Sequence, residues 1–332
     1  MAQEILVILT ILGTVIGSGF ISGKEIVVFF SRFGMWSFFC IFLSFFLFFL
    51  LFKLLLNVGE KVAEKLKNNK FYLIANIILC VIFSAAMYGG IINLLNFDNI
   101  FIKLLILSII LMFCFIIFKK GLKSLNKFNL FLVPSMMIIF FVLLLPKLKG
   151  GVEFSLEKFG GASVFYSVLY CVLNTSNGSV IISSLGQKLS CKQKTRVALI
   201  SALVLSAMIA LVNFVLLSHP ASFDYGMPVL SIFSGVGFII MNIVIFLGCL
   251  TTLFSLTYSC ASTFRDAKGN EYLNFLISIA LPFFVSLLGF SFVVEFLYPL
   301  ASVLGGFLLS QLLFISFFKR ADKKIHAGGK KA

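Results

Sequence analysis

The chain has 332 residues, of which 61% are hydrophobic and only 12% are charged, and its mean hydropathy is +1.13. This composition excludes an ordinary water-soluble domain and predicts a membrane protein. The formal net charge of +15 would suit a nucleic acid partner, but the basic residues lie in short segments between apolar stretches. That distribution is typical of topological charge, so we expect no nucleic acid partner.

Ten apolar segments approach or exceed the roughly 20 residues that a helix needs to cross a bilayer. We expect the longest, the eighth, to extend into the cytoplasm. The first lacks the basic start and the cleavage site of a signal peptide, so we expect it to be retained. The predicted spans are residues 4–30, 36–58, 71–95, 100–118, 128–145, 162–185, 197–217, 229–264, 272–290 and 292–318.

No polar stretch is long enough for a soluble domain, so the prediction is a single membrane domain over residues 1–332. Its first half is residues 4–145, its second half is residues 162–318, and residues 319–332 form a basic cytoplasmic tail. Pro146, Pro220 and Pro228 mark the ends of apolar segments, and the other three prolines fall inside predicted spans. Residues 59–70 are amphipathic and predict a short helix on the cytoplasmic surface.

The orientation follows from the positive charges. Twenty-one of the 27 lysines and arginines lie in alternate loops and the tail on one side, and six lie on the other. The positive-inside rule places both termini in the cytoplasm, which agrees with an even number of spans. The abundance of lysine and phenylalanine fits an AT-rich genome, and we expect a multi-pass protein of a bacterial cytoplasmic membrane.

The first span contains four glycines, Gly13, Gly17, Gly19 and Gly23. Each glycine destabilises a helix interior by about 1 kcal/mol relative to alanine. Freed backbone groups in a membrane are tolerated only where protein or a water-filled cavity satisfies them, so the run around Ser18 predicts a broken helix. The alternative is that these glycines only allow close packing of helices.

A second polar interruption falls in the sixth span, at Asn174, Thr175, Ser176 and Asn177 before Gly178. The ten spans divide into two groups of five, and an odd number per half inverts the second half relative to the first. Inverted repeats that each begin with a broken helix are typical of one class of secondary transporters. The fold class is therefore an all-α polytopic membrane protein with ten transmembrane helices in two inverted five-helix repeats, in which helices 1 and 6 are broken.

The sequence from Gly13 to Ile26, GTVIGSGFISGKEI, is similar to the opening of the YkvI-type bacterial membrane proteins. The whole chain resembles the five-plus-five inverted-repeat fold of the amino acid–polyamine–organocation superfamily and of the sodium-coupled neurotransmitter-type symporters. The resemblance implies a transporter that binds a small solute between helices 1 and 6. It also implies a substrate contact for Tyr88 in span 3, although a membrane tyrosine often serves packing alone.

Broken helices present free N–H and C=O groups to a ligand. The expected substrate-binding donors lie around Gly17, Ser18 and Gly19 in span 1. In span 6 they lie around Thr175, Ser176 and Asn177, with the side chains of Asn174 and Asn177 as further options. Such paired helix ends would bind the carboxylate and ammonium groups of an amino acid or related zwitterion.

In span 8, Gly248, Thr251 and Thr252 are spaced three and four residues apart and share one helix face. Carbonyl and hydroxyl oxygens suit a small hard cation such as Na⁺. By resemblance, the carbonyls of Gly13 and Ile16 complete this cation site. The alternative is that the threonine hydroxyls bond back to their own helix.

Few ionisable residues lie within the spans, and such residues are functional candidates by default. The resembling symporters close their outer gate with an ion pair between helices 1 and 10. Lys24 lies one residue from the matching position, so either Lys24 or Glu25 is expected to pair with Glu295. The alternative is that all three side chains extend to the membrane interface.

We therefore expect a secondary active transporter of an amino acid or related solute, coupled to Na⁺ or H⁺ by alternating access. A ligand-sensing receptor on the same fold is the alternative, because superfamily relatives include germinant-sensing subunits. No Ser/His, paired-aspartate or HExxH-like pattern occurs within the spans, so no enzymatic activity is expected. The seven cysteines include no CxxC pair, and we expect neither a cofactor nor a metal centre beyond the coupling ion. The oligomeric state is open.

Overall fold

The computed structural model describes residues 2–58, 69–95, 100–120, 122–149, 160–266 and 271–312. Most of the surface helix predicted at residues 59–70 lies outside the described residues. The loop at residues 150–159 and the tail at residues 319–332 also lie outside them. Within the described residues the chain is nearly all helical.

The first half begins with a helix in three pieces and continues with four longer helices. Its elements are α1 (Ala2–Val15), α2 (Ser18–Ile21), α3 (Lys24–Phe29), η1 (Ser31–Phe33), α4 (Trp36–Leu56), α6 (Lys70–Leu94), α7 (Ile100–Lys120), α8 (Leu122–Leu144) and η2 (Leu145–Lys149).

The second half begins with a bent pair of helices. Its elements are α9 (Gly161–Asn177), α10 (Ser179–Gly186), α11 (Cys191–Leu217), η3 (Pro220–Asp224), α12 (Pro228–Ser231), α13 (Gly235–Asp266), α14 (Glu271–Ser286), α15 (Phe290–Phe292) and η4 (Val293–Leu297), after which the helix continues to residue 312.

Six helices among the described residues are long and apolar enough to cross a membrane, and the pair α9–α10, bent by 62°, is a seventh if it counts as one span. The predicted first span is not among these helices, because it is divided into pieces that are each too short to cross a membrane. The apolar part of α14, Phe275–Ser286, is also short. The chain is a multi-pass membrane protein, and length and composition support part of the expected ten spans.

Several predicted boundaries differ from the structure. The eighth span was expected at residues 229–264, but α12 is a separate turn that Pro228 begins, and α13 begins only at Gly235, whose φ is 56°. Proline at the first position of a helix has its φ already set, and glycine tolerates a positive φ. The 32 residues of α13 agree with the expectation that this helix is longer than one span.

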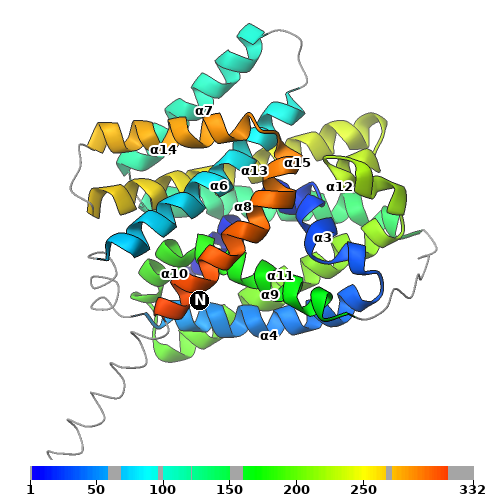
Figure 1. The fold of residues 1–332 in the computed structure, drawn as a ribbon, viewed down its shortest axis with the longest axis horizontal. Coiled ribbons are helices and arrows are strands. Elements are labelled where there is room, and N and C mark those ends of the chain that lie inside the picture. The colour runs from blue at the N-terminus through cyan, green and yellow to red at the C-terminus, as the bar shows by residue number, and fades with distance from the viewer. Residues whose placement is uncertain are drawn as a thin grey trace, which may run out of the picture.

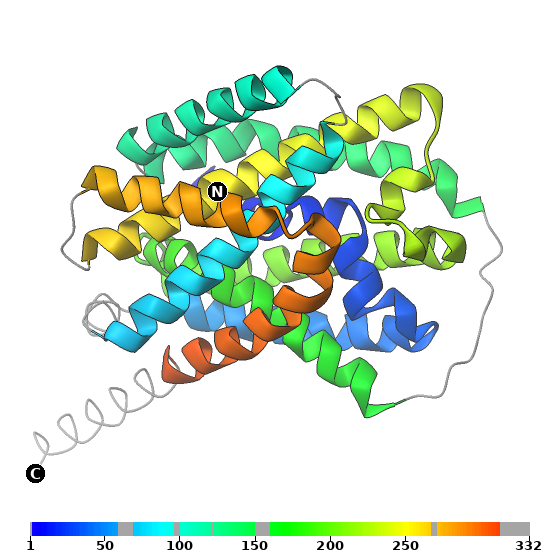
Figure 2. The ribbon, with the colours of Figure 1, turned by 45° about the horizontal axis from the view of Figure 1, so that its top comes forward.

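The helices form two groups on either side of the broken first helix. In Figure 1, α6, α13 and α14 lie on one side, and α4, α9, α10 and α11 lie on the other. Figure 2 shows the same arrangement after rotation, with the blue segment of α1 to α3 between the two groups. The most extensive contacts pair α6 with α13 and α4 with α11, and α1 packs against α8, α11 and α13.

The surface of the bundle carries large apolar side chains. Phe42 on α4, Phe101 on α7 and Phe131 on α8 are 62%, 78% and 74% exposed. A water-soluble protein does not expose so many large apolar side chains, whereas lipid tails solvate them well. Several of the buried polar side chains lie at the two helix breaks, as described below.

Candidate functional site

The first helix is interrupted twice. Between α1 and α2 only Ile16 and Gly17 leave the helix, and Gly17 is extended with φ −111° and ψ −167°. Ser18 and Gly19, expected within the unwound stretch, instead form the helical turn α2. The unwound stretch is therefore shorter than predicted. The amides of Ser18 and Gly19 are still free donors at the start of α2, because the first amides of any helix lack an intrahelical acceptor.

The second interruption was not predicted and lies at Ser22 and Gly23. Gly23 adopts a left-handed conformation with φ 81°. The carbonyl of Ser22 accepts a hydrogen bond from the amide of Val229 in α12, at 2.7 Å. The loop on the predicted outer side is therefore bonded to the backbone of the broken helix. The four glycines of the first span contain this signal, because Gly23 lies one turn beyond Gly19.

The sixth predicted span breaks one residue later than expected. Helix α9 continues through Thr175, Ser176 and Asn177, and the chain turns at Gly178. These three residues are therefore the last turn of α9, which presents free carbonyl oxygens rather than the amide donors that the sequence predicted. The amides left without an intrahelical acceptor belong to the start of α10, from Ser179 onward.

The side chains of Asn174, Thr175, Ser176 and Asn177 divide into two kinds. Asn174 Nδ2 donates to the Tyr170 carbonyl at 3.1 Å, and Ser176 Oγ donates to the Leu173 carbonyl at 2.9 Å, so both bond to their own helix. Thr175 Oγ1 and Asn177 Oδ1 are buried and have no hydrogen-bond partner. Buried polar atoms are nearly always paired in folded proteins, so these two atoms mark a place for a polar ligand or water.

The two breaks lie next to each other. A Cβ atom at Gly178 would lie 3.2 Å from Oγ1 of Thr14, in the last turn of α1. Ser18 Oγ lies 3.3 Å from the Ala86 carbonyl of α6 and 3.5 Å from Met87 Sδ. The break of the first helix therefore faces both α9–α10 and α6.

Three of the five residues predicted for the cation, Gly13, Ile16 and Thr252, meet at one point. The Thr252 hydroxyl on α13 lies 3.4 Å from the Gly13 carbonyl and 3.2 Å from the Ile16 carbonyl. The Thr251 hydroxyl lies 3.0 Å from the Gly248 carbonyl of its own helix. The break at Ile16 turns its carbonyl away from the α-helical pattern and toward α13. Three oxygen atoms from two distant parts of the chain, the end of α1 and α13, thus face one another in the core.

Glu25 is folded back against the first break. It is 2% exposed, and a Cβ atom at Gly19 would overlap its carboxyl group. Gly19 therefore lacks a side chain at the place that the carboxyl occupies. Tyr170 of α9 and Tyr298, in the turn after η4, lie close enough to interact electrostatically with Glu25.

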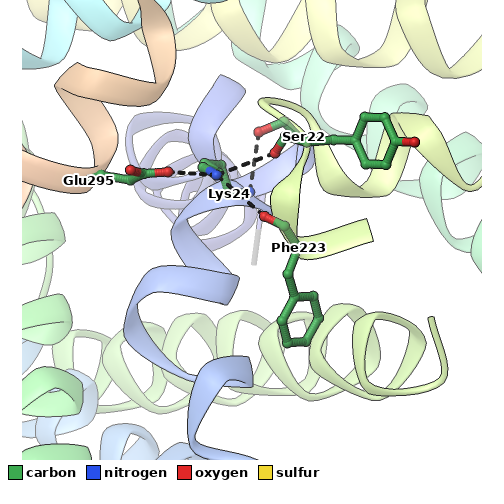
Figure 3. A network of polar contacts seen from close by, with 5 residues as sticks. Ser22, Lys24, Phe223 and Glu295 are labelled. Atoms are coloured by element: carbon green, nitrogen blue, oxygen red, sulfur yellow. Dashed lines mark hydrogen bonds and ion pairs between the residues drawn. The ribbon is translucent and has the colours of Figure 1, made fainter. Parts of the chain in front are cut away.

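Lys24 joins three segments at the predicted outer end of the site (Figure 3). Its Nζ atom lies 2.6 Å from Glu295 Oε1 in η4, 3.4 Å from the Phe223 carbonyl and 3.3 Å from the Tyr225 carbonyl. Of the two candidates in the first span, Lys24 and Glu25, it is Lys24 that pairs with Glu295. A cavity of about 410 Å³ lies beside these contacts, and Tyr225, Asn93 and Phe238 line it.

The contacts of Tyr88 lie away from the breaks. Its ring packs edge-on against Phe283 of α14, with 6.3 Å between centroids, and its electrostatic neighbour is Cys114 of α7. The substrate contact assigned to Tyr88 stays a prediction. Sequence reasoning missed Tyr170 and Tyr298, whose hydroxyls are buried without a hydrogen-bond partner. Tyr170 precedes Asn174 by one turn and Tyr298 follows Glu295 by three residues, which is the only signal in the sequence.

The fold and these breaks define a polytopic membrane protein with interrupted helices in its core. No protein-family model and no curated protein matches the chain. Among solved structures, it is similar to MHP1, a nucleobase-cation-symport-1 family transporter in a closed conformation with bromovinylhydantoin bound. The match covers 92% of this chain and 76% of that one, with a TM-score of 0.55 and 13% sequence identity. The likeness shows a similar fold and leaves transport and the YkvI-type family as predictions.

Proposed function

We propose that the protein is a secondary active transporter of a small polar solute, most simply an amino acid or related zwitterion. The observation that carries the proposal is that two buried polar atoms without partners, Thr175 Oγ1 and Asn177 Oδ1, lie where the breaks of two helices meet. Inside a membrane, polar groups without partners are costly, so a site of this kind is maintained by a ligand that satisfies it. The protein would lie in the bacterial cytoplasmic membrane with both termini inside.

The contacts between helices support the proposed inverted repeat. If α4 corresponds to α11 and α6 to α13, then exchanging the halves turns α4·α9 into α11·α1 and α6·α14 into α13·α7. All four contacts are present, as are α1·α13 and its counterpart α6·α9. The two pairs α4·α11 and α6·α13 are their own counterparts, as expected for helices beside a pseudo-two-fold axis. We infer ten spans in two inverted repeats of five.

Na⁺ is the proposed coupling ion. The carbonyls of Gly13 and Ile16 and the hydroxyl of Thr252 supply neutral oxygen atoms, which suit a hard cation. The Gly248 carbonyl and the Thr251 hydroxyl lie on the same stretch of α13. Ion binding at this point would tie the end of α1 to α13 and thereby favour one conformation of the first helix.

The experiment is uptake of radiolabelled solutes into proteoliposomes with and without an inward Na⁺ gradient. The panel contains amino acids and also hydantoins, because the similar solved structure holds a hydantoin. Gly17→Leu should abolish uptake, since even a Cβ atom there would lie 3.0 Å from Met87 and from Thr252. Gly161→Leu is the matched control, because no atom lies within 4 Å of its Cβ position.

Normal uptake by Gly17→Leu at wild-type expression would overturn the location of the site. The sensor alternative predicts a different result: solutes would stabilise the purified protein against thermal unfolding, and none of them would accumulate in proteoliposomes. No specific observation favours the sensor over the transporter.

A further inference from the structure

Glu25 has a buried carboxyl group without a cationic partner. Its side chain is 2% exposed, and Oε2 has no hydrogen-bond partner. The adjacent Lys24 does not compensate it, because an ammonium group has three donors and Lys24 Nζ already has three acceptors. These acceptors are Glu295 Oε1 at 2.6 Å and two backbone carbonyls at 3.3 and 3.4 Å.

The other elements that pack against α3 supply no positive charge to this carboxyl. Short helices α2 and α12 contain no titratable side chain, and those of α11 lie in its first turns, at residues 191–196. Arg32 in η1 stacks on the ring of Tyr166 at 4.0 Å, and Asp224 in η3 is exposed. The titratable groups that face Glu25 are Tyr170 of α9 and Tyr298 after η4, and Glu295 of η4 is the other acid near α3.

A buried carboxylate with no counter-ion costs several kcal/mol, and such groups become neutral instead. The packing leaves little room for a bulky cation, because the carboxyl lies directly against the backbone of Gly19. A proton needs no such space. The tyrosine hydroxyls beside Glu25 also fit a neutral acid, because they can accept from its O–H group as well as donate to its carbonyl oxygen.

We propose that Glu25 is a proton-binding site, neutral while the outer face is closed and ionised when that face opens. Lys24 and Glu25 are neighbours on α3, so separation of the Lys24–Glu295 pair moves Glu25 as well. Opening exposes the carboxyl to outside water, and the acid releases its proton there. Closing takes the proton back from outside water, which regenerates the neutral acid. This proposal rests on the alternating access of the proposed function, and it makes the opening of the outer face depend on the external pH.

The test uses Cys249 as a reporter, because it is fully buried and packs beside Gly90 and Ser18. In a variant that retains only this cysteine, intact cells are treated with a charged, membrane-impermeant thiol reagent at about pH 5.5 and about pH 8, a range in which a water-exposed glutamate is ionised. The labelling rate reports how often the outer face opens. Glu25→Gln in the same background corrects for the ionisation of the thiol itself.

The expected result is that lowering the pH slows labelling about tenfold more in the parent than in Glu25→Gln, because one bound proton changes the equilibrium up to tenfold per pH unit. Equal pH dependence in the two proteins would overturn the proposal. Dependence on external Na⁺ instead of pH would also overturn it, since the neutralising charge would then be sodium. Glu4→Gln is the matched control, because Glu4 already pairs with Arg196 at 3.3 Å.

If Glu25→Gln fails to reach the membrane, infrared spectroscopy of the purified wild type in lipid gives a second readout. The carbonyl band of a buried carboxylic acid should be present at neutral pH in the wild type, and its frequency should change in Glu25→Asp, whose shorter side chain withdraws from Gly19. A wild type without this band would refute the proposal. Neither experiment needs a transported solute, so failure to find uptake would reject the proposed function without deciding the role of Glu25.

Discussion

Thr251 and Thr252 are adjacent on α13, and their hydroxyl groups have different partners. Thr251 bonds to the Gly248 carbonyl within the same helix, as buried threonines in helices commonly do. Thr252 reaches across to the two carbonyls at the end of α1. Only the Thr252 hydroxyl therefore connects the two helices, and the two threonines are not equivalent ligands in the state that the structure represents.

Thr252→Val should raise the Na⁺ concentration for half-maximal uptake by about tenfold, because loss of one oxygen contact in a dry site costs on the order of 1.4 kcal/mol. Thr257→Val is the control, since the Thr257 hydroxyl, unlike that of Thr252, bonds to a carbonyl of its own helix, that of Leu253. The measurement is the Na⁺ dependence of initial uptake rates. If uptake by the wild type does not depend on Na⁺, the proposed sodium site is ruled out.

At the residue scale, sequence reasoning identified atoms that the structure brings together. The spacing of span 8 and the resemblance for Gly13 and Ile16 both pointed to the contact at Thr252. The sequence did not reveal Tyr170 and Tyr298, because their significance arises from packing against Glu25, which no local pattern specifies. An aromatic residue in a membrane span is ordinary until its neighbours are known.

At the scale of elements, the second interruption of the first helix depends on Gly23. Its φ of 81° is accessible to glycine at no steric cost, and a Cβ atom there would lie 2.7 Å from Val229. The same turn exposes the Ser22 carbonyl to the Val229 amide. Conformation, packing and hydrogen bonding therefore all require glycine at this position.

Gly23→Ala should lower the stability of the protein by about 2 to 5 kcal/mol, which combines about 1–2 kcal/mol for a left-handed backbone with about 1–3 kcal/mol for overpacking. Gly235→Ala separates these contributions, because Gly235 also has a positive φ, of 56°, but no atom within 4 Å of its Cβ position. Thermal unfolding in detergent should show the larger loss for Gly23→Ala. Equal losses would show that contact with Val229 is unimportant.

The elements themselves were easier to predict than their breaks. Apolar length identified the long helices, and proline identified several of their ends. Glycine and polar content located the first break within a few residues, but a helix ends where its carbonyls find other partners. Ile16 leaves the helix because its carbonyl faces Thr252, and Asn177 stays helical until Gly178 allows the turn. These partners lie far away in the sequence.

At the scale of the whole molecule, Lys24 connects the first helix, η4 and the η3 loop. Glu295 is 39% exposed at its side chain, whereas Lys24 is 6% exposed. The pair therefore lies at the boundary between the core and the predicted outer surface. Its separation would open a path from the cavity beside Tyr225 toward the helix breaks.

Lys24→Gln should increase outside labelling of Cys249 more than Glu295→Gln does, because Lys24 loses three partners and Glu295 loses one. The double variant should be milder than the sum of the two, since it leaves no charge uncompensated. Labelling of the three variants in the Cys249-only background measures this. Strict additivity would show that the two side chains do not interact in the membrane.

The long apolar helices followed from simple physical limits on a membrane chain. The bilayer sets the apolar length that a spanning helix needs and the side on which positive loops lie. The sequence could not show which of Lys24 and Glu25 would meet Glu295. That depends on the twist introduced at Gly23, and one residue of helix rotates a side chain by about 100°.

The π-helical turn η4 holds Glu295 with one residue more than an α-helix would use. Such a surplus residue can pass along a helix: the turn closes as α-helix and the next turn takes up the extra residue. Each side chain that is passed rotates about the helix axis by about 100°, while both ends of the helix stay in place. Glu295 would swing away from Lys24 in this way, so the outer contact could be released by a travelling register defect inside one helix.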